Sequence, residues 1–313
     1  MRIATLALAF AVVLATDVAA QNRPIKVAYS AISAGIGGLW LTHEQGLFKK
    51  HGLDSSLIYF RSGTTATQAL LAGEIQFGHL APGAIMTAWA QGADFVWIGT
   101  TTHKMVFTLV AEPGIARGEG LKGKKIGITR LGSAADLAAR TALEHLGLTT
   151  KDVSLISMGG IPEILTGLRA GAVQAGILSP PFSTAALEAG YKRLVFIPDL
   201  GKEFTFSGIA AKRDYIAASP QTAQAFMAAL TEGANIYKED TKAALKVLKK
   251  YVGVDNERLL EAGYREYATA LTSPPYPSMK GLEAVRESLV DTAPTLKNAD
   301  LRKFVDDRFV KSK

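Results

Sequence analysis

A thirteen-residue segment occurs twice in this sequence, at residues 70–82 and again 98 positions later at 168–180. In each copy an Ala-Gly pair precedes a short apolar run and a proline. This order predicts a helix end, a left-handed turn residue, a buried strand and a helix begun by proline. Two copies predict two similar α/β lobes, because a solenoid needs at least three repeats. The identical pairs are Leu70/Leu168, Ala72/Ala170, Gly73/Gly171, Gln76/Gln174, Gly78/Gly176, Leu80/Leu178 and Pro82/Pro180.

Residues 1–20 have the pattern of a secretory signal peptide. Arg2 precedes an apolar stretch from Ile3 to Ala15, which is too short to span a bilayer. The segment Val18-Ala-Ala20 matches the small-residue cleavage pattern, so we expect cleavage before Gln21 and an exported, soluble mature chain. An uncleaved N-terminal anchor is the alternative.

Composition excludes several classes of function. The chain has no cysteine, which excludes disulfides, thiol catalysis and a lipid-modified cysteine after the signal. Its net charge is +7, but basic residues do not form a stripe interleaved with aromatics, so nucleic acid is not expected as a partner. The five histidines lack metal-ligand spacing. The sequence also contains no G-x-S-x-G, Walker A or H-E-x-x-H pattern. We therefore expect no metal, no cofactor and no catalytic residues.

Strand-like and helix-like segments alternate up to residue 212, which predicts parallel-rich sheets covered by helices on both faces. Stretches near 105–112 and 204–212 are β-like and predict two hinge crossings between the lobes. We place lobe 1 at residues 21–108 and 208–313, including a C-terminal helical wrap, and lobe 2 at 109–207. One helix is predicted over 39–48. Capping boxes are predicted at Thr65/Gln68 and Ser133/Asp136.

Loops at the carboxyl ends of the strands face the binding crevice in sheets of this kind. Most of these loops lead into a helix start rich in Ser, Thr or Gly, where free N–H groups and the helix dipole attract oxyanions. We therefore expect the two lobes to close on a small solute. The candidate ligand-binding residues are Ser33, Trp40, Ser62, Gly63, Thr64, His79, Ser133, Ala134, Gly160 and Ser179, with Arg61 and Arg130 as candidate anion partners.

Each candidate also has a purely structural interpretation. The serines and threonines of these loops are equally suited to capping helices. The two arginines follow strands and also suit positions that point into solvent. Trp40 has a spacing that fits core packing as well as a stacking wall. His79 lies in a predicted buried strand, where a histidine bonded within the core is common.

Segments 38–48, 51–53, 72–78 and 121–127, in this order and together with the exported start, carry a family resemblance. They resemble the periplasmic solute-binding proteins of the sulfonate, taurine, nitrate and thiamine-precursor uptake systems. The resemblance implies a type II periplasmic-binding-protein fold that delivers its solute to an ABC permease in the inner membrane. It also implies that the loop with Ser33 and Trp40 is the first ligand loop.

By the same resemblance, Ser62–Thr64 looks like the second ligand loop, Gly132–Ala134 like the third and Ser179-Pro180 like the fourth contact. Eukaryotic enzyme members of the family use a cysteine-rich motif, which this chain lacks. We therefore expect a monomeric periplasmic binding protein for a small oxyanion such as a sulfonate or carboxylate. The alternatives are a neutral heterocycle as ligand, an enzyme on the same fold, or an extracytoplasmic sensor.

Overall fold

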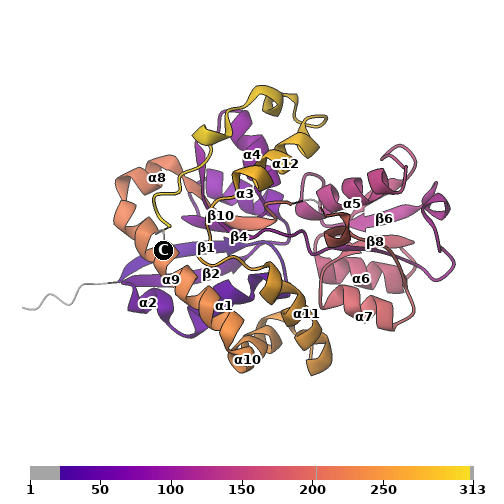
Figure 1. The fold of residues 1–313 in the computed structure, drawn as a ribbon, viewed down its shortest axis with the longest axis horizontal. Helices are drawn as coiled ribbons and strands as arrows, with labels where there is room; N and C mark the ends of the chain where they lie inside the picture. Colours follow the sequence, from indigo (N-terminus) through magenta and orange to yellow (C-terminus); the bar gives the residue numbers. More distant parts are fainter. Residues whose placement is uncertain (1–21, 202, 311–313) are drawn as a thin grey trace, which may run out of the picture.

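A computed structural model describes residues 22–201 and 203–310, so the predicted signal peptide lies outside the described residues. Two five-stranded sheets, each with helices packed against it, lie side by side (Figure 1). We call the first sheet with its helices lobe 1 and the second lobe 2. Among the described residues, the structure contains no helix that combines the length and the apolar character needed to cross a membrane.

The two sheets have the same strand order. The order in lobe 1 is β2-β1-β3-β10-β4, and in lobe 2 it is β7-β6-β8-β5-β9. The strands of lobe 1 are β1 (Arg23–Tyr29), β2 (Leu53–Tyr59), β3 (Phe77–Leu80), β4 (Phe95–Thr102) and β10 (Ser207–Lys212). The strands of lobe 2 are β5 (Thr108–Ala111), β6 (Lys125–Ile128), β7 (Ser154–Ser157), β8 (Ala175–Leu178) and β9 (Lys192–Phe196).

One strand in each sheet runs against the others. β10 pairs antiparallel with β3 and β4, and β5 pairs antiparallel with β8 and β9, while the remaining pairs are parallel. Each antiparallel strand is the first one formed after the chain leaves the other sheet. The passages lie between β4 and β5 and between the 3-10 helix η3 (Ile197–Leu200) and β10. The lobe boundaries at residues 108 and 208 stay predictions.

Apart from α2, which follows α1 and leads into β2, the helices of the two lobes follow the carboxyl ends of the strands. In lobe 1 they are α1 (Gly37–Glu44), α2 (Leu47–Lys50), α3 (Gly63–Leu71) and α4 (Pro82–Ala90), preceded by the 3-10 helix η1 (Ala34–Ile36). In lobe 2 they are α5 (Ala134–His145), α6 (Ile161–Arg169) and α7 (Phe182–Glu188). The single helix predicted over 39–48 is wrong, because Gly46 adopts a left-handed φ of 68° and separates α1 from α2.

Helices from the C-terminal third pack mainly around lobe 1. They are α8 (Arg213–Ala218), α9 (Pro220–Glu239), α10 (Thr241–Val252), α11 (Glu257–Ala270) and α12 (Met279–Leu289). In Figure 1 they occupy both sides of the lobe 1 sheet, with α9 and α10 beside α1 and with α12 beside α4. α11 also contacts α7, so the wrap reaches lobe 2.

The repeated segment forms the centre of each sheet. Gly73 and Gly171 both have the expected positive φ, 76° and 69°. The side chain of Gln76 accepts a hydrogen bond from Lys26 N at 2.8 Å, and that of Gln174 accepts one from Lys125 N at 3.2 Å. Each glutamine therefore joins the start of β3 or β8 to the neighbouring parallel strand.

A small residue in the repeated strand lets the preceding helix pack closely. A Cβ placed on Gly176 would lie 2.5 Å from Ile164 Cγ2 and 3.2 Å from Leu168 Cδ1. At the equivalent Gly78, a Cβ would lie closest to Leu80 Cδ1 of the same strand, at 2.7 Å, and would meet Leu70, the counterpart of Leu168, at an ordinary contact distance of 3.7 Å. The turn glycines Gly73 and Gly171 and the glutamines Gln76 and Gln174 thus have the same structural roles in both lobes.

Two local predictions from the sequence are corrected. Pro82 is the first residue of α4, but Pro180 is not in a helix, because α7 begins at Phe182. The cap of α3 is Ser62 rather than Thr65, since the Ser62 side chain accepts a hydrogen bond from Thr65 N.

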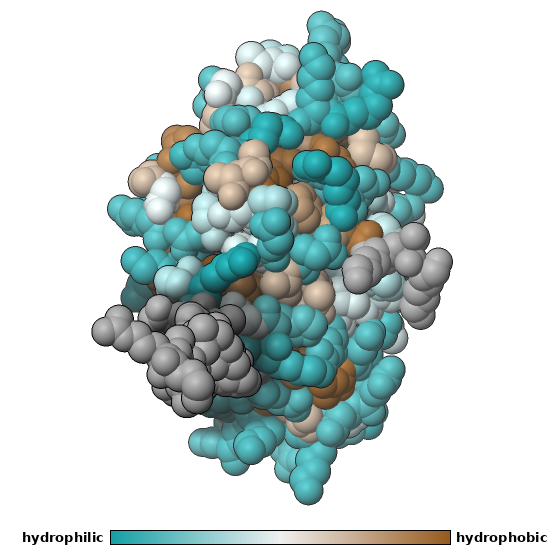
Figure 2. Space-filling view, turned by 90° about the vertical axis from the view of Figure 1, so that its left-hand side faces the viewer, coloured by the Kyte–Doolittle hydropathy of each residue, from teal (hydrophilic) through white to brown (hydrophobic). Residues whose placement is uncertain are grey.

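Large apolar side chains fill the space between sheet and helices. In lobe 1, the ring of Phe77 on β3 stacks on Phe226 of α9 with centroids 4.1 Å apart, and Phe48 stacks on the same ring. On the face in Figure 2 hydrophilic residues predominate, and hydrophobic residues form small separated areas.

We expect Gly176→Ala to lower the free energy of unfolding by about 1–3 kcal/mol, because the added methyl group overpacks the contact between β8 and α6. Urea denaturation would measure the change. Gly114→Ala is the control, since a Cβ at that exposed turn position meets nothing within 4 Å. Equal stabilities of the two variants would contradict the proposed role of Gly176.

Candidate functional site

A cavity between the two lobes lies at the carboxyl ends of the central strands. It contains about 590 Å³ of empty space, counting its opening to solvent. Residues that follow β1, β3, β6 and β8 line it, together with residues from both passages between the sheets and one residue from α11.

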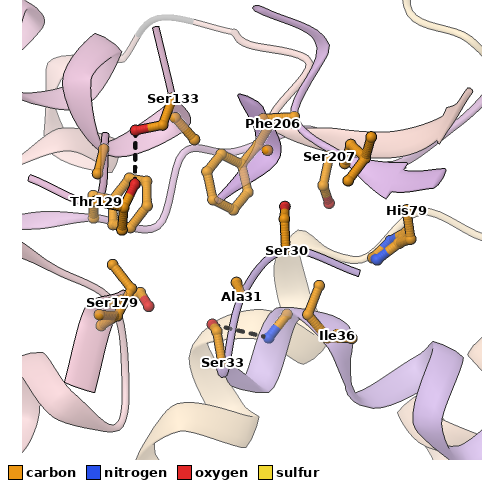
Figure 3. A pocket seen from close by; sticks show the side chains of 18 of the residues that line it. Ser30, Ala31, Ser33, Ile36, His79, Thr129, Ser133, Ser179, Phe206 and Ser207 are labelled. Carbon is orange, nitrogen blue, oxygen red and sulfur yellow. Dashed lines mark hydrogen bonds between the residues drawn. The ribbon is translucent and has the colours of Figure 1, made fainter. Parts of the chain in front are cut away.

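Hydroxyl groups from both lobes face this cavity (Figure 3). Ser33 of lobe 1 is 3% exposed and accepts a hydrogen bond from Gly35 N at the start of η1. In lobe 2, Thr129 donates to the Ser133 side chain at 2.7 Å, and Ser133 accepts from Asp136 N at 3.3 Å. Asp136 in turn accepts from Gly132 N at 2.9 Å, so the predicted cap at Ser133/Asp136 is confirmed.

His79 of β3 borders the lobe 1 side of the cavity. Its Nε2 lies 2.7 Å from the Thr101 hydroxyl, which lies 3.1 Å from the Ser207 hydroxyl. Burial lowers the pKa of His79 to about 4, so the ring is neutral at neutral pH. Its Nδ1 atom is buried and has no hydrogen-bond partner among the described residues.

Two other polar groups complete the uncharged lining. The Ser179 hydroxyl after β8 is buried beside the Tyr267 phenol and, like His79 Nδ1, forms no hydrogen bond of normal geometry among the described residues. Tyr267 of α11 donates to the Val106 carbonyl at 3.3 Å, and burial raises the pKa of its phenol. Among the described residues that line the cavity, only His79 and Tyr267 have ionisable side chains, and both are neutral at pH 7.

C-terminal helices hold the segment after β1 and the first passage between the sheets. The Tyr237 hydroxyl on α9 donates to the Ala34 carbonyl at 2.9 Å, and Tyr267 bonds Val106 as described above. Both tyrosines are at most 1% exposed. The C-terminal wrap therefore fixes cavity-lining backbone that would otherwise be a free loop.

The structure brings together six of the sequence-predicted ligand-binding residues at this cavity, namely Ser33, Gly63, His79, Ser133, Ala134 and Ser179. Three others lie beside it. Ser62 caps α3, Gly160 immediately precedes α6, and the Thr64 hydroxyl donates across the lobes to the Leu131 carbonyl at 3.3 Å.

Trp40 and the two arginines lie outside the cavity. Trp40 is fully buried and stacks on Tyr251 of α10 with centroids 4.8 Å apart, so it packs in the core of lobe 1. The Arg61 side chain is 65% exposed and forms a 3.3 Å ion pair with Glu163 of the other lobe. Arg130 is exposed. Neither arginine supplies a countercharge inside the cavity.

Several cavity residues have no signal in the sequence. Phe107 and Phe206 come from the two passages between the sheets and meet edge to face with centroids 5.2 Å apart. Tyr267 lies in the amphipathic helix α11, and Ser207 opens β10. The passages were expected from the sequence, but the side chains by which they line the cavity were not.

Comparison with known proteins finds a family match and relatives that are named as binding proteins. The family model described as NMT1/THI5 like matches residues 33–244. A putative binding protein of Brucella abortus (strain 2308) is 29% identical over 242 residues, which cover 77% of this chain and 75% of that protein. A putative aliphatic sulfonates-binding protein of Escherichia coli (strain K12) is 28% identical over 251 residues, which cover 76% and 75% of the two chains.

A solved structure has a similar fold. The alkanesulfonate-binding protein SsuA from Xanthomonas axonopodis pv. citri, bound to MOPS, matches with a TM-score of 0.78 at 20% identity. The match covers 91% of this chain and 98% of that one. It confirms the predicted two-lobe α/β fold with parallel-rich sheets.

The neutral state of His79 predicts a loss of stability in acid. Between pH 6.5 and 4 the unfolded chain binds a proton that the folded chain excludes, so the free energy of unfolding falls as the pH is lowered through this window. The shift corresponds to about 3 kcal/mol. Between pH 7 and 4.5 the free energy of unfolding should fall by about 2 kcal/mol less in His79→Gln than in the wild type, because glutamine does not titrate. Urea denaturation at the two pH values measures this difference.

His145→Gln, at an exposed position on α5, is the matched control for this comparison. If His79→Gln and the wild type lose stability equally in acid, the buried neutral state of His79 is wrong.

Proposed function

Since the chain belongs to the NMT1/THI5-like family, we propose that it is the periplasmic solute-binding protein of an ABC importer. It captures a small oxyanion such as a sulfonate or a carboxylate in the interlobe cavity and delivers it to the permease as a monomer. The relatives named as binding proteins for unspecified ligands and for aliphatic sulfonates support this proposal. The observation that carries it is the uncharged, hydroxyl-lined cavity formed by both lobes.

Helix N-termini from opposite lobes supply the electrostatics of anion binding. Gly63 begins α3 in lobe 1, Ala134 begins α5 in lobe 2, and both residues line the cavity. Free N–H groups at a helix start carry partial positive charge and favour an oxyanion. The buried, unpartnered Ser179 hydroxyl and His79 Nδ1 are available for hydrogen bonds to the same solute. An anion is thus bound without a cationic side chain.

Binding between lobes couples the solute to closure. The lobes already meet through the Arg61–Glu163 pair, the Thr64–Leu131 hydrogen bond and a 2.6 Å ion pair between Arg258 of α11 and Glu188 of α7. A solute that contacts hydroxyls from both lobes stabilises the closed arrangement relative to an open one. The permease then distinguishes the loaded protein from the empty one by its shape.

We expect small sulfonates and carboxylates to raise the melting temperature in a thermal-shift screen, because a ligand that binds only the folded state stabilises it. Neutral heterocycles of similar size are the comparison set. Stabilisation by the heterocycles alone would contradict an anionic solute. Consumption of the bound compound during incubation would instead favour an enzyme on this fold.

Ser179→Ala tests the cavity itself. We expect it to weaken binding of the best anion from the screen roughly tenfold in isothermal titration calorimetry, since it removes a hydrogen bond to a charged group. Its stability without ligand should change little, because the hydroxyl has no partner among the described residues. Ser219→Ala is the control, as that serine precedes α9 without a side-chain capping bond. Unchanged affinity in Ser179→Ala would place the solute elsewhere.

A further inference from the structure

The hydroxyl of Ser133, on the lobe 2 side of the cavity, has both of its acceptor positions filled. Thr129 donates its hydroxyl proton to Ser133 Oγ at 2.7 Å (Figure 3), and Asp136 N donates to the same oxygen at 3.3 Å. A third donor, Arg130 N, lies 3.5 Å away. A hydroxyl oxygen has two lone pairs and a single proton. Ser133 therefore accepts as many hydrogen bonds as it can, and only its proton is left to donate.

The proton of Ser133 has no acceptor in the part of the chain that the structure describes. Each hydrogen bond of its hydroxyl there is one that it accepts, and the residue lines the cavity. Ser33, which caps η1 in the other lobe, is placed differently. It lies beside the phenol of Tyr267, whose oxygen has lone pairs for it because the phenol proton goes to the Val106 carbonyl. Of these two serines, only Ser133 keeps its proton for a solute.

The hydrogen bond from Thr129 decides whether Ser133 donates or accepts. We propose that Thr129 is a positioning residue for solute recognition, whose donated proton fixes Ser133 as a hydrogen-bond donor toward the solute. The proposal rests on the proposed function. Thr129 follows β6, is buried, and accepts a hydrogen bond from Gly159 N at its carbonyl at 3.0 Å. Its branched side chain has few rotamers, so its hydroxyl is held in place. Donation by Thr129 also polarises the Ser133 O–H bond, because hydrogen bonds in a chain strengthen one another.

Backbone amides at the start of α5 extend this donor. Ala134 N and Ala135 N have no acceptor among the described residues, and both residues line the cavity. The nearby carboxylate of Asp136 forms an ion pair with Arg140 Nε at 3.1 Å, which reduces its repulsion of an anion. A solute atom that contacts the Ser133 hydroxyl and these amides must be an acceptor without a proton of its own.

The Thr129 hydroxyl therefore controls selectivity between two kinds of solute group. Without it, one lone pair of Ser133 is free, and the serine hydroxyl can turn about its Cβ–Oγ bond without movement of heavy atoms. Ser133 can then accept a hydrogen bond from an N–H or O–H group of a solute. With Thr129 in place, such a group meets a donor and is disfavoured, because its proton is left without a partner.

Calorimetric titration with two matched pairs of probes tests the proposal. The pairs are methanesulfonate with methanesulfonamide, and acetate with acetamide. Thr129→Val removes the donated proton at nearly the same side-chain volume. We expect it to weaken binding of the anions about fivefold, because the Ser133 proton is no longer directed at them. The preference for each anion over its amide should fall by at least the same factor, since Ser133 can now accept from the amide.

Two further variants separate positioning from effects on structure. Thr129→Ser keeps the hydroxyl and should bind the anions within about twofold of the wild type. Thr141→Val makes the same change as Thr129→Val at another buried threonine, on α5 and outside the cavity, and should bind like the wild type. Equal anion affinities of Thr129→Val and the wild type would overturn the inference while leaving the anion-binding function intact.

Ser133→Ala shows whether Thr129 acts through the serine. In that background Thr129→Val should cause no further loss of anion affinity, whereas independent contributions would add. A loss that persists without the Ser133 hydroxyl would overturn the inference, because Thr129 would then act on the solute by another route. Binding of neither methanesulfonate nor acetate by the wild type would refute the anion-binding function and this inference together.

Discussion

The hydrogen bonding of the two strands that follow the passages determines how this molecule is assembled. β5 joins β8 and β9, and β10 joins β3 and β4, so each sheet is completed by a strand that arrives from the other lobe. The residues just before these strands, Phe107 and Phe206, line the cavity. The same backbone pairing that completes the sheets therefore places the passages against the interlobe cavity.

The polar groups in the cavity are neutral because the cavity is buried. Burying an unpaired charged side chain there would cost more free energy than its attraction to a solute supplies. The arginines near the site accordingly lie outside the cavity. Hydroxyls and backbone N–H groups bear partial charges that need no countercharge when the cavity is empty. The burial that lowers the pKa of His79 keeps this residue in the same neutral class.

The repeat was readable from the sequence because its residues act locally. Gly171 turns the chain, Gln174 accepts a hydrogen bond from the neighbouring strand, and Gly176 leaves room for a helix. Each of these roles requires a particular residue type, which is visible in the sequence. The loops that line the cavity could be located for a similar reason, since they follow strands. Which loop residues face a solute depends on how the lobes meet, and neither spacing nor composition records that.

Trp40 and Tyr267 illustrate this limit: Trp40 was a predicted site residue but packs in the core, whereas Tyr267 was not predicted but lines the cavity. Both are buried aromatic residues on helices, and either spacing suits core packing or a cavity wall. The difference arises from partners distant in sequence. Tyr251 covers the ring of Trp40, whereas Tyr267 reaches the first passage, 161 residues away along the chain.

The strand order has a consequence for biosynthesis. All strands of lobe 2 lie between residues 108 and 196, whereas lobe 1 needs β10 and helices that end near residue 289. Because the chain is synthesised from its N-terminus, lobe 2 has all of its strands available while lobe 1 still lacks β10. Pairings between distant segments form slowly because a large loop must close first. The earliest strands of the polypeptide thus belong to the part that matures last.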